Sequence, residues 1–356
     1  MAKPGVLKRI GRTTAALAIG AVLLPVAFAQ PAPRPLPTVD ARVEQGAPPP
    51  VGQAPSPDPS GGKATPAGAY LDQAIALLRE QHINSPGADW DRIAAHARGA
   101  LRRTSTPDGA YDAIRGILRE LGEEHSFFMP AGRGSGPRLP PHTLEMPAYT
   151  ALGRVGFVRV PGFIGSPEEA ALYTGVLREI LGRLDRKGVC GWIIDLRSNG
   201  GGNMWPMLNG LDPLLGKGPF GSFRYPAGNM RYWSRVGGKI VDDPKEGDAP
   251  PAFSLRGAAL PVAVLLSAQT ASSGEIVAAA LIGRSNLRTF GDPTSGFTTA
   301  NGVFPLPDGA QLVITTAHIR DRTGHEYKGP IQPDESVRPE AAPAAAQRWL
   351  ASQGCR

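Results

Sequence analysis

Hydrophobic residues recur at helical spacing in three consecutive segments of the first third of the chain. These segments span residues 70–81, 89–102 and 108–121. In the first of them Leu71, Ile75 and Leu78 are three or four positions apart, which places them on one face of a helix. Helices with one apolar stripe are stable when their stripes pack together, so we expect a small helical bundle over residues 69–128.

From residue 154 onwards the pattern changes to apolar strands that alternate with helices. Strands are predicted at residues 155–160, 189–196 and 261–266, and helices at residues 167–186, 206–215 and 272–283. Shorter strands are expected near Thr289, Val303 and Leu312. A turn-rich loop at residues 130–147 precedes this region. Continuous apolar runs such as VAVLL at residues 262–266 are typical of strands covered on both faces, so we expect an α/β domain over residues 129–353.

The first 29 residues have the pattern of a secretory signal peptide, residues 1–29. Basic residues without any acidic one precede an apolar run, which closes on Ala27-Phe28-Ala29, an Ala-x-Ala cleavage pattern. Pro25 interrupts the run, which is shorter than the roughly 20 residues of a membrane-spanning helix. A cleaved signal is therefore favoured over an uncleaved anchor. We expect an exported protein, periplasmic or extracellular, with no integral membrane segment after cleavage.

Residues 30–68 are rich in proline and glycine, in runs such as PAPRPLP and GAPPPVG. They hold too few large apolar side chains to offset the entropy of ordering the chain, so we expect a disordered tether. The remainder is long enough to bury a large core.

Charge and cysteine content exclude several classes of protein. The formal net charge is +7, and without the basic residues of the signal it is about +3, without long runs of one sign. Nucleic acid is therefore not an implied partner. The two cysteines, Cys190 and Cys355, exclude a disulfide framework. One bridge could join them, but we expect both thiols to be free.

A glycine-rich run, DLRSNGGG at residues 195–202, directly follows a predicted buried strand and leads towards a helix. Glycines let backbone N–H groups approach a ligand closely, and the start of a helix favours negative charge. The run alone is compatible with a tight turn, with phosphate binding or with stabilisation of an oxyanion.

A second run, TASSGE at residues 270–275, also follows an apolar strand and opens a helix. Ser272 and Glu275 have the spacing of a capping box, in which both side chains bind backbone N–H groups at the helix start. A serine between a strand and a helix also suits a nucleophile, because its hydroxyl projects from the sheet edge. Capping is the more common role of such a serine, and the two roles are compatible.

A serine nucleophile needs a base, usually a histidine oriented by an acid, and the chain has six histidines. Four are expected to be structural or solvent-facing: His82, His96, His142 and His318. His125 lies at a helix-to-strand junction in EEHSFF, where the helix dipole alone favours a histidine. His325 precedes Glu326 in a turn-like segment, where solvated residues are expected.

Four segments, in this order, resemble elements of the tail-specific (C-terminal-processing) and tricorn-like serine protease family. DLRSNGGG resembles its Asp-Leu-Arg-x-Asn-x-Gly-Gly element, and TASSGEIVAAAL resembles its Ser-Ala-Ser-Glu nucleophile helix. GDPTSGF resembles its Gly-Glu-Pro-Thr-x-Gly loop, and EYKGPIQPD resembles its closing Glu-Gly-x-Gly-Ile-x-Pro-Asp segment. The resemblance implies a serine endopeptidase with a crotonase-like (ClpP/crotonase-type) α/β spiral core behind the helical bundle. It also implies protein or peptide substrates and no metal or other cofactor.

The resemblance also assigns roles to residues. One branch of the family takes its base from a lysine directly after the glycine of the Pro-Thr-x-Gly loop, where this chain has Phe297. A phenylalanine cannot accept a proton, so the chain resembles the tricorn-like branch, with an N-terminal histidine and a C-terminal glutamate. The implied roles are Ser272 as nucleophile, His125 as general base and Glu326 as the acid that orients the imidazole.

The resemblance places the oxyanion at the backbone N–H groups of Ser273 and of Gly201 or Gly202. Tricorn has a serine immediately before its histidine, whereas this chain has Glu124 there and Ser126 after the histidine.

Many relatives also insert a PDZ domain, which needs about 80 to 100 residues, and the stretch between residues 128 and 154 is too short for one. We therefore expect substrate capture by the core or the helical bundle. Two other functions fit the same fold: a non-catalytic peptide- or lipid-binding protein, and a serine hydrolase of esters.

Overall fold

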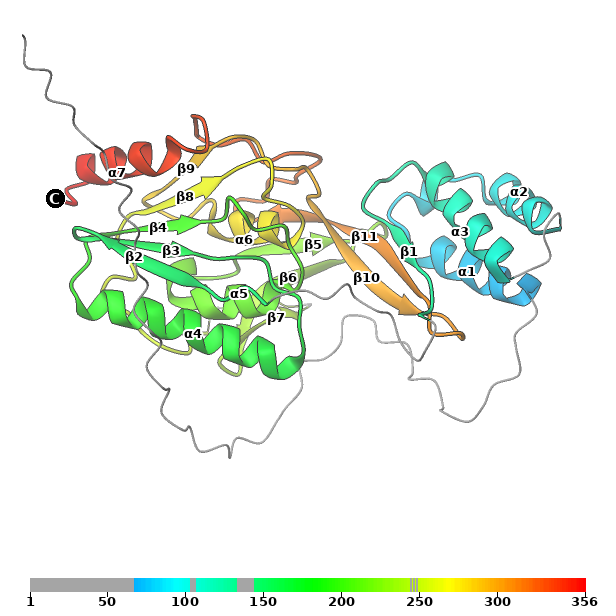
Figure 1. Cartoon of the computed structure of the whole chain (residues 1–356), viewed down its shortest axis with the longest axis horizontal. Helices are drawn as coiled ribbons and strands as arrows, with labels where there is room; N and C mark the ends of the chain where they lie inside the picture. Colours follow the sequence, from blue (N-terminus) through cyan, green and yellow to red (C-terminus); the bar gives the residue numbers. More distant parts are fainter. Residues whose placement is uncertain (1–66, 103–106, 133–143, 244, 246, 248) are drawn as a thin grey trace, which may run out of the picture. The chain divides into compact units, whose positions relative to one another are not determined.

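The predicted helices near the start of the chain are present and form a bundle (Figure 1). They are α1 (Ala67–Gln81), α2 (Trp90–Arg102) and α3 (Pro107–Leu121), with the short helix η1 (Ser85–Gly87) before α2. Leu71, Leu78, Ile114 and Ile117 are buried, which confirms that the apolar stripes face inwards.

The computed structural model describes residues 67–102, 107–132, 144–243, 245, 247 and 249–356. All of them belong to one compact unit, residues 48–356. The predicted signal peptide lies outside the described residues, and so does the predicted tether except for its last two residues, which already belong to α1. No helix in the described part of the chain is long and apolar enough to cross a membrane.

The hydrophobic core of the bundle extends onto two strands from the other end of the sequence. These are β10 (Thr299–Pro305) and β11 (Gln311–Asp321), an antiparallel pair. Phe304, Leu312 and Ile314 on these strands are buried in the same cluster as the residues of α1 to α3. The core therefore crosses the boundary that we expected between residues 128 and 129.

Strands β10 and β11 belong to an antiparallel sheet, here called sheet A. The other members are β1 (Phe127–Met129), β5 (Gly221–Arg224), β6 (Met230–Val236) and β7 (Lys239–Asp243). Strand β10 pairs with one side of β11. On the other side of β11, β1 pairs with residues 311–313 and β5 pairs with residues 318–321. Strands β5 to β7 were not predicted.

The predicted α/β core is confirmed by a second sheet, here called sheet B. Its strand order is β12 (Glu335–Ser336), β9 (Leu287–Gly291), β8 (Val262–Leu266), β4 (Gly191–Asp195), β3 (Val155–Arg159) and β2 (Ala148–Leu152). Only the β2–β3 pair is antiparallel among these described strands.

Helices cover both faces of sheet B, as the continuous apolar runs predicted. The helices are α4 (Pro167–Arg186), α5 (Met204–Leu211), α6 (Ser273–Leu281) and α7 (Ala342–Ser352), with the short helix η2 (Asp212–Leu215) after α5. Alternate residues of β4 face opposite sides: Ile194 packs in the cluster of α4 to α6, and Ile193 packs in the cluster of α7. Every residue of β4 and β8 is buried.

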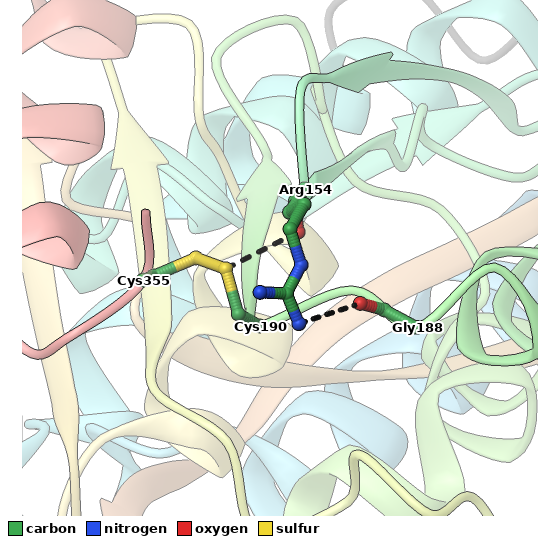
Figure 2. The surroundings of a disulfide bond; sticks show 4 residues. All are labelled: Arg154, Gly188, Cys190 and Cys355. Atoms are coloured by element: carbon green, nitrogen blue, oxygen red, sulfur yellow. Dashed lines mark hydrogen bonds between the residues drawn. A yellow bond between two sulfur atoms is a disulfide. The ribbon is translucent and has the colours of Figure 1, made fainter.

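The expectation of free thiols is wrong, because Cys190 and Cys355 form a disulfide (Figure 2). They are 165 residues apart in the sequence, and their Cα atoms are 5.0 Å apart. The packing of α7 on sheet B brings them together: Leu350 lies against Gly191, the residue after Cys190. Local sequence carried no signal of this approach.

Candidate active site

Ser272 lies in a strained backbone conformation between β8 and α6. Its φ is 52° and its ψ is −120°, a region that non-glycine residues rarely adopt. Such strain costs of the order of 1–3 kcal/mol and persists where the surroundings enforce it. A serine held this way at a strand-to-helix turn is typical of a nucleophile.

Glu275 provides part of that enforcement. It is fully buried, and its carboxylate accepts hydrogen bonds from the backbone N–H of Ser272 at 2.9 Å and of Gly296 at 2.8 Å, and from the hydroxyl of Thr294. Burial raises the pKa of Glu275, and these hydrogen bonds oppose the rise. The glutamate of the predicted capping box therefore ties the turn that carries Ser272 to the loop that carries Phe297.

His125 reaches Ser272 from the far side of the sequence. Its Nε2 lies 3.1 Å from the Oγ of Ser272, which is hydrogen-bonding distance. The imidazole packs against the ring of Phe297, with 5.0 Å between the ring centroids. Burial lowers the pKa of His125, so the imidazole is neutral near pH 7 and able to accept a proton.

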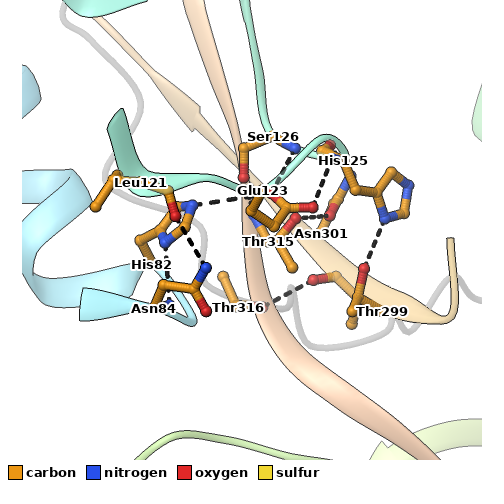
Figure 3. A network of polar contacts seen from close by, with 11 residues as sticks. His82, Asn84, Leu121, Glu123, His125, Ser126, Thr299, Asn301, Thr315 and Thr316 are labelled. Atoms are coloured by element: carbon orange, nitrogen blue, oxygen red, sulfur yellow. Dashed lines mark hydrogen bonds and ion pairs between the residues drawn. The ribbon is translucent and has the colours of Figure 1, made fainter. Parts of the chain in front are cut away.

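The third position of the predicted triad is occupied by Thr299 and not by Glu326. Nδ1 of His125 lies 2.7 Å from the Oγ1 of Thr299, the first residue of β10 (Figure 3). Glu326 instead accepts two hydrogen bonds from Arg224 on β5, one of them at 2.8 Å. This ion pair lowers the pKa of Glu326.

The pairing of strands explains why Glu326 binds Arg224 and not His125. Glu326 follows β11, and its backbone forms an antiparallel β-bridge with Arg320. The C-terminal end of β11 pairs with β5. This pairing brings the Arg224 guanidinium to the carboxylate, and a bidentate arginine is a strong partner for it. Thr299 was not predicted, because a hydroxyl two residues after Phe297 has no distinguishing pattern.

Both glycines expected at the oxyanion site lie beside the turn that carries Ser272. Gly201 has a φ of +105° and Gly202 a φ of +103°, and a Cβ atom on Gly201 would come within 2.8 Å of the Cβ of Ser272. The N–H of Gly201 is already bound to the Oδ1 of Asn199 at 3.0 Å. Within the described part of the chain, no acceptor is found for the N–H of Gly202 or of Ser273.

Asn199, which was not predicted as a site residue, links the glycine run to the turn that carries Ser272. It is fully buried, and its side-chain amide donates to the carbonyl of Val160 at 3.0 Å. Its backbone carbonyl accepts from the N–H of Ala271 at 3.0 Å. The asparagine of DLRSNGGG thus holds the glycine run against the turn that carries Ser272.

The residues on either side of His125 differ in their surroundings. Ser126 is buried and its hydroxyl accepts a hydrogen bond from the N–H of Thr315 on β11 at 2.9 Å, whereas Glu124 is exposed. Ser126 therefore anchors the loop to sheet A. Of the other histidines, His82 is buried, His96 pairs with Glu120 on the surface, and His142 lies outside the described residues.

The last two histidines lie near Glu326. His318 is a half-buried residue of β11, and the ring of His325 packs against Tyr327. Among the described residues no group of three or more His, Cys, Asp or Glu side chains is placed to hold a metal ion.

Comparison of the sequence with models of known protein families shows the class of protein to which the chain belongs. Residues 154–337 match the model of peptidase family S41, which is more than half of the chain. The chain therefore belongs to peptidase family S41, a family of serine-type peptidases, and the family that the four motif segments predicted is confirmed.

Two curated relatives show how far the similarity extends. The chain is 33% identical over 202 residues to the nisin-resistance protein of Lactococcus lactis subsp. lactis, covering 56% of this chain and 61% of the relative. It is 26% identical over 199 residues to a chloroplastic C-terminal processing peptidase of Tetradesmus obliquus, covering 56% of this chain and 38% of the relative. The match thus spans less than two thirds of either relative.

Two solved structures share the fold. A lipoprotein from Streptococcus agalactiae superposes with a TM-score of 0.68 at 24% identity, covering 82% of this chain and 98% of that one. A photosystem II D1 C-terminal processing protease superposes with a TM-score of 0.57 at 17% identity, covering 78% of this chain and 95% of that one. The predicted fold, a helical segment followed by a crotonase-like α/β core, is confirmed by this likeness.

Proposed function

We propose that the protein is a serine endopeptidase in which Ser272 is the nucleophile and His125 the general base. The observation that carries the proposal is the distance of 3.1 Å between His125 Nε2 and Ser272 Oγ, at a serine held in a strained turn. His125 would take the proton of the hydroxyl as Ser272 attacks the scissile carbonyl, and would then give it to the leaving amine. Water would hydrolyse the acyl-enzyme by the same route.

The N–H groups of Gly202 and Ser273 are the proposed oxyanion donors. Gly201, the other candidate, already donates to Asn199, which supports Gly202 as the glycine partner of Ser273. Removal of one oxyanion donor typically costs about 3 kcal/mol of transition-state stabilisation.

Thr299 is proposed to hold the imidazole in the productive tautomer. If Nδ1 carries the proton and donates it to the Thr299 hydroxyl, Nε2 is left as the acceptor that faces Ser272. A neutral hydroxyl stabilises a charged imidazole less than a carboxylate does, so a negative charge from elsewhere is needed. Glu326, the acid implied by the resemblance, is neutralised by Arg224 in this arrangement.

The proposed substrates are proteins or peptides in an exported compartment, periplasmic or extracellular. The disulfide between Cys190 and Cys355 supports export, because disulfides form and persist in oxidising compartments. The similarity to the nisin-resistance protein makes nisin a reasonable first peptide to offer, alongside an unbiased peptide library.

A fluorophosphonate probe, which reacts with activated serines, tests the proposal directly. Wild type is expected to be labelled, Ser272→Ala not at all, and His125→Ala at a rate lower by about a hundredfold or more. Ser352→Ala, which removes a serine on the surface of α7, is the control and should label as wild type does. Equal labelling of wild type and Ser272→Ala would overturn the proposal.

Turnover assays separate the alternatives. Ser272-dependent cleavage products in the library, seen by mass spectrometry, exclude a purely binding protein. Hydrolysis of esters without any cleavage of peptides would instead favour an esterase on the same scaffold.

A further inference from the structure

The loop that carries His125 is held by a carboxylate that the proposed mechanism does not use. Glu123 lies between the end of α3 and β1, and its two oxygens accept hydrogen bonds from two consecutive backbone N–H groups (Figure 3). One is the N–H of His125, and the other is the N–H of Ser126 at 2.8 Å. The chain leaves α3 through Gly122 at a φ of 66°, so Glu123 supplies acceptors where helical hydrogen bonding has ended.

Two further contacts fix the same loop on sheet A. The side-chain amide of Asn301 on β10 donates to the carbonyl of His125 at 3.0 Å, and the hydroxyl of Thr315 on β11 donates to Asn301 at 3.0 Å. The backbone of His125 is therefore bound on its N–H side by Glu123 and on its carbonyl side by Asn301. A displacement of about 1 Å of such a group can cost a hundredfold in rate.

A buried histidine at the end of α1, His82, lies beside the carboxylate of Glu123. His82 is 1% exposed, and its Nδ1 accepts the N–H of Asn84 at 3.1 Å. In the neutral ring the proton is therefore on Nε2, which lies 3.8 Å from the Oε2 of Glu123. Asn84 also donates to the carbonyl of Leu121 at 3.0 Å, so the end of α1 is fastened to the end of α3.

The electrostatic surroundings give Glu123 a second effect. Thr299 is neutral and Glu326 is paired with Arg224, so neither places a free negative charge against the imidazole. Burial lowers the pKa of His125, and the charge of Glu123 opposes this and raises it. Glu123 thus favours the imidazolium that forms when His125 takes the proton of Ser272.

We propose that Glu123 is a positioning residue for catalysis, which holds the backbone of His125 so that the imidazole meets Ser272 and which supplies the negative charge that Thr299 lacks. This inference rests on the proposed function. It also gives the helical bundle a role in catalysis, because Glu123 follows α3 and contacts the His82 side chain at the end of α1.

The test compares Glu123→Gln, Glu123→Asp and Glu124→Gln in the full chain. Glutamine retains one acceptor oxygen, loses the other and carries no charge, whereas aspartate keeps the charge on a shorter side chain. Glu124 is the matched control, since it is the adjacent glutamate and its side chain is exposed. The measurements are the rate of fluorophosphonate labelling against pH and, for a cleaved peptide, kcat and KM.

For Glu123→Gln we expect the labelling rate and kcat to fall by about tenfold to a hundredfold while KM changes less than about twofold. The acid limb, which is the low-pH side of the plot of labelling rate against pH, should move to lower pH. The reason is that the pKa of His125 falls when the neighbouring negative charge is removed. Glu123→Asp should recover part of the rate and keep the limb near that of wild type. Glu124→Gln should match wild type throughout.

A folded Glu123→Gln protein with the rate and pH limb of wild type would overturn the inference, and so would equal effects in Glu123→Gln and Glu124→Gln. A smaller yield of folded protein with an unchanged rate per folded molecule would show a purely structural role and would also overturn it. Ser272→Ala in the same assay separates the two proposals: labelling that does not depend on Ser272 removes the proposed function, whereas Ser272-dependent labelling that ignores Glu123 removes only this inference.

Discussion

The imidazole Nδ1 of His125 faces the hydroxyl of Thr299 at 2.7 Å, the position that an acid holds in a Ser-His-acid triad. The two residues are 174 positions apart in the sequence and meet because β10 begins beside the loop between α3 and β1. Thr299 thus presents a neutral group to the imidazole, while the carboxylate of Glu123 binds the backbone N–H of His125.

Replacement of Thr299 should therefore cost more activity than replacement of Glu326. Thr299→Val keeps the shape of the side chain and leaves Nδ1 of the half-buried imidazole without its partner, and an unsatisfied polar group typically costs about 1–3 kcal/mol. We expect fluorophosphonate labelling to slow by about tenfold or more. Glu326→Gln removes an ion pair with Arg224 and should slow labelling by less than about threefold.

The two variants also decide between the two candidate orienting groups. If Glu326→Gln abolishes labelling and Thr299→Val does not, the glutamate implied by the family resemblance reaches His125 during catalysis. Circular dichroism on both variants excludes unfolding as the cause of either loss.

Gly201 is expected to tolerate no side chain. In Gly201→Ala the new Cβ would lie 2.8 Å from the Cβ of Ser272, and the φ of +105° is unfavourable for alanine. Either the turn that carries Ser272 or the glycine run must move, and a shift of about 1 Å can cost about a hundredfold in rate. Labelling by the fluorophosphonate probe measures the loss.

Gly200→Ala is the matched control for that prediction. No atom lies within 4 Å of a Cβ built on Gly200, and its φ is not in the left-handed region. It should label at close to the rate of wild type. Equal labelling of Gly200→Ala and Gly201→Ala would show that the close approach of Gly201 to Ser272 has no bearing on the reaction.

The elements that the sequence predicted correctly are those with a strong local period. The stripes of α1 to α3 repeat every three or four residues, β8 is a continuous apolar run, and both β4 and β8 are buried throughout. The contact between His125 and Ser272 was also anticipated, because motif resemblance identified both residues. Strands β5 and β6 show no clean alternation of buried and exposed residues, and β7 is a short strand whose sequence, KIVDD, does not alternate apolar and polar residues, so all three were missed.

The contacts that could not be predicted join residues far apart in the sequence. Thr299 reaches His125 through the pairing of β10, β11 and β1, and Cys190 reaches Cys355 through the packing of α7. Neither is encoded by a local pattern. The pairing of Glu326 with Arg224 likewise depends on β5, a strand that the sequence did not reveal.

The acid limb of the activity profile is expected to have its midpoint below pH 6.5. Burial lowers the pKa of His125 from its ordinary value of 6.5, and a general base works only while it is neutral. Lowering the pH therefore removes activity only once it passes the depressed pKa. The rate of labelling from about pH 4.5 to pH 8 measures this, and a midpoint above 6.5 would contradict it.

Stability against urea should also fall as the pH falls, because a second buried histidine, His82, resists protonation in the folded chain. Burial also lowers the pKa of His82, so the unfolded chain binds protons more readily than the folded one. The contribution of His82 to stability is present above pH 6.5, its ordinary value, and is lost as the pH falls through the folded pKa. Urea unfolding at about pH 7 and pH 5 should show a smaller drop in midpoint for His82→Gln than for wild type, and an equal drop would count against this account.

Breaking the disulfide should destabilise the α/β core more than it affects the active site. The bond between Cys190 and Cys355 closes a loop of 165 residues and fixes the chain after α7 beside the start of β4. Loss of a disulfide typically costs about 2–4 kcal/mol, with long loops towards the upper end. We expect Cys190→Ala/Cys355→Ala to unfold at a lower guanidinium concentration, while its labelling rate per folded molecule stays within about twofold of wild type. Reductant should lower the midpoint of wild type and leave the double variant unchanged; a reductant-sensitive double variant or an insensitive wild type would show that the bridge does not support the fold.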